Sequence, residues 1–173
     1  MPLKRFIPLL IYLCCLTLGF SQNEPSIDFV IRNVGINVDG HFEVFNIDTD
    51  FDATGKLLEI NGIIKVASIE TGIDSRDEHL LKADYFDIEN YENITLVSKK
   101  IEYKSYGVFS VVAILTIKDK SKEILITVNR DKLDNQYKIT SNFVINRRDF
   151  EVGGRSFVLG NTVKINVLHF HKL

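Results

Sequence analysis

The sequence predicts an all-β protein made of about eight antiparallel strands and one short helix. Three observations support this class. Most of the chain after Ser26 alternates between apolar and polar residues with the period of two that is typical of half-buried strands. The pieces between the alternating segments are short and turn-rich, and such connections favour antiparallel pairing because parallel crossovers need roughly a dozen residues. Only residues 68–91 depart clearly from the alternation.

Residues 1–21 are expected to form a secretory signal peptide. Lys4 and Arg5 provide a basic start, an almost wholly apolar run follows over residues 6–20, and small residues stand near the end of that run. The apolar run is shorter than the ~20 residues that a bilayer span needs, which disfavours a membrane anchor. We therefore expect a mature protein that begins near Gln22 and is periplasmic or secreted from a bacterium.

The mature chain, residues 22–173, is expected to be one domain large enough to bury a core without cross-links. Both cysteines leave with the leader, so disulfide, thiol and thiolate-metal chemistry are excluded. Removing Lys4 and Arg5 takes the formal net charge from −2 to −4. This acidic balance argues against a nucleic-acid partner, and no basic run or basic amphipathic helix indicates tight docking on an anionic membrane.

The expected strands follow one another along the whole mature chain. The first begins at Ser26, with Ile27, Phe29 and Ile31 on one face. One or two more are expected within residues 39–52. The remaining expected strands are residues 57–68, 94–104, 107–117, 122–129, 136–147 and 162–170.

Several of these strands have one strongly apolar face that must be covered. These faces are formed by Phe109, Val111, Ala113, Leu115 and Ile117, by Ile124, Ile126 and Val128, and by Val163, Ile165 and Val167. With little helix available, the sheet must either close into a barrel or fold into a sandwich, and an eight-stranded barrel can be filled or can hold a small ligand. The residue pattern leaves these alternatives open, although the small Ala113 and Ser141 at inward positions favour a cavity.

Residues 68–91 are expected to carry the single helix. Ser75 and Glu78 fit a capping box, in which each side chain bonds to the other's backbone N–H, so a short helix is predicted over residues 76–84. The segment has too few apolar residues to be stable alone. Tyr85 and Phe86 are therefore expected to pack it against the body of the protein as a lid or plug.

The same segment resembles the signature of the YceI-like polyisoprenoid-binding family. The matching residues are Ser68, Ile69, Thr71, Gly72, Arg76, Asp77, His79, Leu80, Leu81, Tyr85, Phe86 and Asp87. Residues 115–117 and 146–150 resemble two further family segments in the expected order. The sequence departs from the family pattern at three turn positions, Asn93, Asp119 and Glu151.

The resemblance implies a lipocalin-like barrel that binds a long apolar lipid, such as a polyisoprenoid or an isoprenoid quinone, as a carrier or sequestering protein without a cofactor. Apolar inward-facing residues are then the expected ligand site, with Arg76 and His79 at the mouth for a head group. The expected ligand-binding residues are Phe109, Val111, Ala113, Leu115, Ile124, Ile126, Phe143, Val163, Ile165, Arg76 and His79. No catalytic or metal-binding residue, no stable membrane insertion and no particular oligomer is predicted.

Each polar candidate also has a plainer interpretation. Arg76 and its neighbour Asp77 are expected chiefly to tie the helix start to a neighbouring strand. His79 lacks an evident partner for general-base catalysis. His169 and His171 have the spacing of a two-histidine metal site but no evident third ligand. The rivals to a lipid carrier are a filled barrel that acts through protein contacts and, less favoured, a hydrolytic or metal-dependent enzyme.

Overall fold

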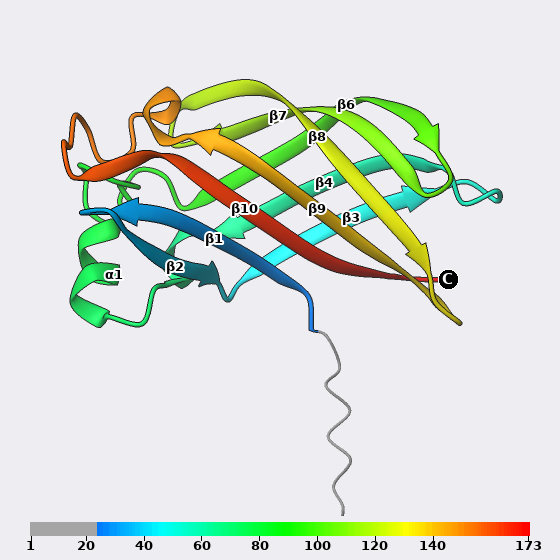
Figure 1. Cartoon of the computed structure of the whole chain (residues 1–173), viewed down its shortest axis with the longest axis horizontal. Coiled ribbons are helices and arrows are strands. Elements are labelled where there is room, and N and C mark those ends of the chain that lie inside the picture. The colour runs from blue at the N-terminus through cyan, green and yellow to red at the C-terminus, as the bar shows by residue number, and fades with distance from the viewer. Residues whose placement is uncertain (1–23) are drawn as a thin grey trace, which may run out of the picture.

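The computed structural model describes residues 24–173, and the expected signal peptide lies outside the described residues. These residues form one curved antiparallel sheet of ten strands, with one α-helix at one end (Figure 1). The predicted all-β antiparallel fold with one short helix is confirmed, with ten strands in place of about eight. The elements are β1 (Ser26–Asn33), β2 (Ile36–Phe42), β3 (Phe45–Phe51), β4 (Leu57–Lys65), the 3-10 helix η1 (Val66–Ser68), β5 (Ile69–Glu70), α1 (Asp74–Leu80), β6 (Asn93–Ser105), β7 (Val108–Ile117), β8 (Lys120–Lys132), β9 (Gln136–Asn146), the 3-10 helix η2 (Arg147–Phe150) and β10 (Leu159–Lys172).

The strands follow the order β3-β4-β6-β7-β8-β9-β10-β1-β2-β5 across the sheet. Two bends bring the ends of this order together: β2 runs on into β3, and β4 runs on through η1 into β5. The bent strands stay hydrogen-bonded through the corner, because Glu43 N donates to Ser68 O at 3.1 Å and Lys65 N donates to Val44 O at 2.9 Å. The sheet therefore curls round on itself and encloses an interior.

Side chains join the free edge of β3 to the end of β10. Thr49 Oγ1 lies 2.9 Å from His171 Nδ1. The Phe51 ring lies 4.9 Å from the rings of both His171 and Tyr137. Since β3 and β10 share no backbone ladder, this seam depends on side-chain contacts alone.

The half of the interior farther from α1 is filled. Along β7 every second side chain is buried, as the sequence pattern predicts, and Phe109, Val111 and Ala113 are at most 1% exposed. Val128 on β8 and Ile139 on β9 are equally buried and belong to the same core. Ala113 is thus small because large neighbours occupy the space around it.

Ala113→Phe is expected to lower the free energy of unfolding by about 1–3 kcal/mol, because a ring at this position overpacks a filled core. Urea unfolding of ligand-free protein measures the effect. Val112→Phe is the matched control, since Val112 is only partly buried and lies on the opposite face of the strand. An Ala113→Phe protein with an unchanged unfolding midpoint would show that this half of the interior contains space.

The helix differs in its bounds from the prediction. It begins two residues earlier than expected and ends four residues earlier, at Leu80. The predicted capping box is wrong: Ile73 is the N-cap, no side chain caps the helix, and Ser75 already lies in the first turn. Tyr85 and Phe86 pack against the core as predicted, so the segment after the helix covers one end of the barrel. Within residues 24–173 no helix has the length and apolar character needed to cross a bilayer.

Candidate ligand-binding site

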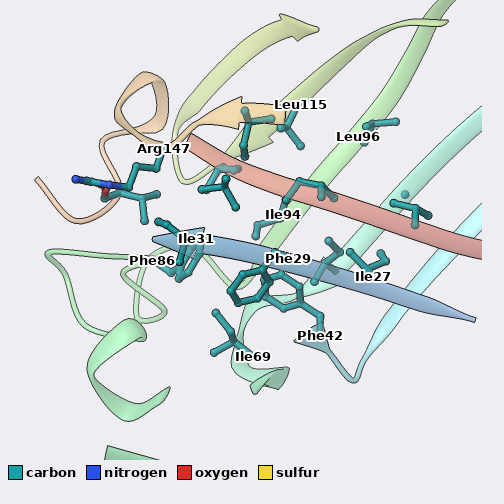
Figure 2. A pocket seen from close by; sticks show the side chains of 18 of the residues that line it. Ile27, Phe29, Ile31, Phe42, Ile69, Phe86, Ile94, Leu96, Leu115 and Arg147 are labelled. Atoms are coloured by element: carbon teal, nitrogen blue, oxygen red, sulfur yellow. Dashed lines mark hydrogen bonds between the residues drawn. The ribbon is translucent and has the colours of Figure 1, made fainter. Parts of the chain in front are cut away.

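A cavity of about 320 Å³ occupies the half of the interior nearer to α1. Its volume is at the lower end of the range of about 300–1,000 Å³ that small-molecule sites occupy. Apolar side chains from most of the strands project into it, and Figure 2 shows a row of them extending from Ile27 toward Arg147. The apolar residues that line it include Ile27, Phe29, Ile31, Val38, Phe42, Ile47, Ile60, Ile64, Ile69, Ile94, Leu96, Leu115, Ile117, Ile126, Phe143, Ile145, Val163, Ile165 and Val167.

Three aromatic rings form one wall of the cavity. The Phe29 and Phe42 rings lie 5.6 Å apart, and Phe86, from the segment after α1, meets Phe42 edge-on at 6.5 Å. Gly40 lies under the Phe29 ring, where an added Cβ would clash with the ring edge. The absence of a side chain at Gly40 therefore lets Phe29 lie close to the sheet, and Phe86 links the covering segment to this wall.

Gly62 leaves open space in the part of the cavity wall that β4 forms. It lies in the middle of β4, where it pairs with Ile47 on β3 and Leu96 on β6, and all three line the cavity. An added Cβ would meet only Asn46 O, at 3.9 Å, which is an ordinary contact. A larger side chain at position 62 would therefore extend into the cavity without a clash at its first atom.

The structure brings seven of the eleven expected ligand-binding residues to this cavity. They are Leu115, Ile126, Phe143, Val163, Ile165, Arg76 and His79. The other four lie elsewhere: Phe109, Val111 and Ala113 belong to the filled half, and the partly buried Ile124 packs against that core. A strand face runs the full length of the barrel, whereas the cavity occupies only one half, so period-two alternation alone could not separate the two groups.

Arg76 and Asp77 tie the start of α1 to the end of β5, as predicted. Arg76 Nε donates to Thr71 Oγ1 at 2.7 Å, and a second guanidinium nitrogen donates to Thr71 O. Asp77 accepts bonds from the hydroxyl and from the backbone N–H of Thr71. This network replaces the capping box, because it fixes the helix entry through side chains within α1. Arg76 also borders the cavity.

Arg76→Ala is expected to lower the stability of the protein by about 1–2 kcal/mol and to change ligand affinity less, because two charge-assisted bonds to Thr71 are lost. The denaturant midpoint and ligand affinity should be measured on the same preparation. Arg148→Ala, at an exposed arginine, controls for the loss of a positive charge. An unchanged midpoint with lost binding would instead identify Arg76 as a ligand contact.

Arg147 is the most deeply buried charged residue at this end, with 3% of its surface exposed. Its five N–H donors reach five oxygens: the carbonyls of Val152, Gly154, Leu159 and Gly160, and Asn161 Oδ1, at 2.6–3.4 Å. Burial, and secondarily the charge of Arg148, lower the pKa of Arg147 from its usual value. Both Arg147 and Arg148 lie in the 3-10 helix η2, where Arg147 is buried and Arg148 is exposed. Because its donors are all engaged, Arg147 acts here as a clamp on residues 152–161.

The three candidate histidines His79, His169 and His171 lie in different surroundings. The exposed His79 packs edge-on against Tyr85 at 4.9 Å, at the border of the cavity. His171 belongs to the β3–β10 seam, and His169, two residues before it, has a pKa lowered mainly by burial and secondarily by His171. Among the described residues, no group of three or more His, Cys, Asp or Glu side chains is arranged to hold a metal ion.

Several cavity residues were not predicted as ligand contacts, although the sequence carries signals for them. Phe29 lies on the apolar face predicted for the first strand, and Phe42 and Ile60 continue similar faces on β2 and β4. Gly62 interrupts the apolar face that Ile60 and Ile64 form on β4, and an interior strand glycine often marks a bend or a close approach of a ligand. These signals identify ligand contacts only once the position of the cavity along the barrel is known.

Comparison with known proteins assigns the fold. A family model described as the YceI-like domain matches residues 20–169, and the chain therefore belongs to the YceI-like family. The structure is similar to that of BcnA from Burkholderia cenocepacia, with a TM-score of 0.80 at 22% identity over 86% of this chain and 96% of the other. It is similar to the YceI protein of Campylobacter jejuni, with a TM-score of 0.75 at 24% identity over 80% and 86%. A structure described as a polyisoprenoid-binding domain from Saccharophagus degradans gives a TM-score of 0.68 at 16% identity over 86% and 93%.

Sequence relatives agree with this assignment. A UPF0312 protein of Staphylococcus epidermidis is 32% identical over 107 residues, which are 61% of this chain and 60% of the relative. A UPF0312 protein of Vibrio parahaemolyticus is 28% identical over 105 residues, 60% of this chain and 56% of the relative. Each alignment spans less than two thirds of the relative's own length. The structural likenesses are below 25% identity, so they establish the fold and not the ligand.

Proposed function

We propose that this protein binds a long apolar lipid in the cavity between its curled sheet and the segment after α1. One observation carries the proposal: the cavity wall is almost wholly apolar, and its aliphatic and aromatic side chains come from strands all around the barrel. Such a wall presents few hydrogen-bonding groups to a polar substrate, whereas a hydrocarbon tail can be buried against it.

Burial of the tail supplies the binding energy. Each buried CH₂ contributes about 0.8 kcal/mol, and ordering of the tail offsets much of the total. The polar groups at the border of the cavity are largely engaged with the protein, Arg76 with Thr71 and Arg147 with backbone carbonyls. We propose a binding role, as a carrier or sequestering protein, and not catalysis.

A polyisoprenoid or an isoprenoid quinone is the proposed ligand class. The structure from Saccharophagus degradans that is described as a polyisoprenoid-binding domain has a similar fold, and this similarity supports the choice.

We further propose that the protein works outside the cytoplasm, in keeping with the predicted signal peptide. N-terminal sequencing of the exported protein tests this, since a start near Gln22 is expected and retention of residues 1–20 in the membrane would contradict it.

Displacement of a fluorescent fatty acid by a series of isoprenoid alcohols of increasing length tests the lipid proposal. Displacement should strengthen with each added unit until the cavity is full and then level off. Straight-chain alcohols with the same number of carbons test preference for the branched tail. Failure of every long-chain lipid to displace the probe, or to bind directly in calorimetry, would overturn the proposal.

A further inference from the structure

The turn between β1 and β2 and the loop before β10 both lie at the α1 end of the barrel (Figure 1). Exposed apolar side chains gather at these two loops and at the start of β2. Val34 and Ile36 are each 70% exposed, Val158 is 58% exposed, and Phe157 is completely exposed. Val34 N donates to Val158 O at 2.9 Å, so the two loops are held together. We call these four residues the apolar tip. Exposed apolar groups gathered in this way typically mark an interaction surface.

Three exposed arginines accompany the apolar tip: Arg32, Arg148 and Arg155. Arg32 and Arg148 line a shallow surface hollow together with Phe157 and Val158. Within residues 24–173, none of the three arginines forms an ion pair. Two acidic residues are near in sequence: the exposed Asp149, and Glu151, which lies 3.8 Å from Lys120. The arginine charges are therefore available to an external anion.

The surface lies directly beside the end of the lipid cavity. Leu159 lines both the cavity and the surface hollow. The clamp formed by Arg147 holds the carbonyls on both sides of the apolar tip, those of Gly154 and Leu159. Gly153 N also donates to Asp84 O at 2.8 Å, which joins this loop to the covering segment after α1. The apolar tip therefore has a fixed position relative to the cavity.

We propose that the apolar tip and its three arginines dock the protein reversibly on an anionic phospholipid bilayer. Apolar side chains can enter the boundary between head groups and acyl chains while arginines bind lipid phosphates. The charge arrangement favours a bilayer over a protein partner, because three exposed arginines with no ion pair among the described residues adjoin the apolar tip, and a bilayer offers both phosphates and acyl chains to this one surface. No basic run marks this surface in the sequence, because the arginines come from three separate segments. This docking does not depend on what the cavity holds.

Single tryptophan reporters test the docking geometry, because the chain contains no tryptophan. Phe157→Trp places a reporter on the apolar tip, and Tyr106→Trp places one at a 79% exposed position on the β6–β7 turn, at the other end of the barrel. With vesicles of phosphatidylcholine and phosphatidylglycerol, the emission of the Phe157→Trp variant should shift to shorter wavelength and be quenched by brominated acyl chains, whereas the control should not change. No change at position 157, or equal changes at both positions, would overturn the proposal.

Co-sedimentation with the same vesicles tests the arginines. Combined Arg32→Gln, Arg148→Gln and Arg155→Gln substitution should weaken partitioning on the order of 100-fold, given the typical contribution of each basic side chain near an anionic membrane. The matched control removes the same charge elsewhere, at the exposed residues Lys56, Lys99 and Lys132. Binding should also fall with added salt and be absent on phosphatidylcholine alone. Equal losses in both triple variants, or no wild-type binding to anionic vesicles, would exclude a bilayer-specific surface and leave a protein partner as the occupant of the apolar tip.

Discussion

Arg147→Met is expected to lower the free energy of unfolding by about 3 kcal/mol or more. The substitution keeps a long side chain but removes all five donors, and each buried carbonyl left without a partner costs about 1–3 kcal/mol. The guanidinium is buried without a carboxylate partner among the described residues, so its bonds to carbonyl oxygens are what compensate for its desolvation. Urea unfolding and ligand affinity should be measured together, because Val152 and Leu159 also line the cavity.

Two further substitutions make this prediction specific. Arg147→Lys should recover only part of the loss, because an ammonium has three donors for five acceptors and cannot reproduce the planar guanidinium. Arg148→Met, at the exposed neighbour, should change stability by less than about 0.5 kcal/mol. If Arg147→Met were as stable as the wild type, the clamp would not be a determinant of the fold, and a direct role for Arg147 in ligand binding would have to be considered.

Gly62→Phe is expected to abolish lipid binding while leaving the protein folded. The phenylalanine ring would enter the cavity between Ile47 and Leu96. Because the cavity is small, the ring would occupy space that a bound lipid tail needs. The ring also replaces an empty space with van der Waals contacts, and glycine within a strand is itself destabilising, so ligand-free stability should be equal to or above that of the wild type.

Gly62→Ala is the matched control. It adds the Cβ, which meets only an ordinary contact, but it does not fill the cavity. Stability should rise by up to about 1 kcal/mol, while lipid binding is retained. Loss of binding in both variants would point to a backbone effect at position 62, and retained binding in Gly62→Phe would place the ligand outside this cavity.

The sequence predicted the sheet well because each strand carries its own pattern. The alternation along β7 identifies which side chains of that strand point inward, and the structure buries the same ones. The Arg76 and Asp77 tie was also predicted, since both charges lie at the start of one short helix. Local periodicity and local charge were sufficient for these features.

The division of the interior into a filled half and a hollow half was not predictable in the same way. Ala113 and Gly62 are both small inward residues, yet Ala113 is surrounded by side chains and Gly62 faces open space. Whether a small residue faces a filled or an empty region depends on which strands lie across the interior from it. That arrangement is a property of the whole sheet and not of one strand. The fivefold clamp of Arg147 likewise depends on a loop that the strand pattern does not describe, and the arginines of the docking surface converge only in the folded chain.

The most direct test of lipid binding is native mass spectrometry of freshly purified wild-type protein beside Gly62→Phe, followed by organic extraction of both. The wild type should carry an added mass that is released as a long apolar lipid on extraction, and Gly62→Phe should carry none although it remains folded. A wild-type protein that has no lipid and cannot be loaded with a long-chain isoprenoid, or an equal lipid content in both proteins, would contradict binding in this cavity.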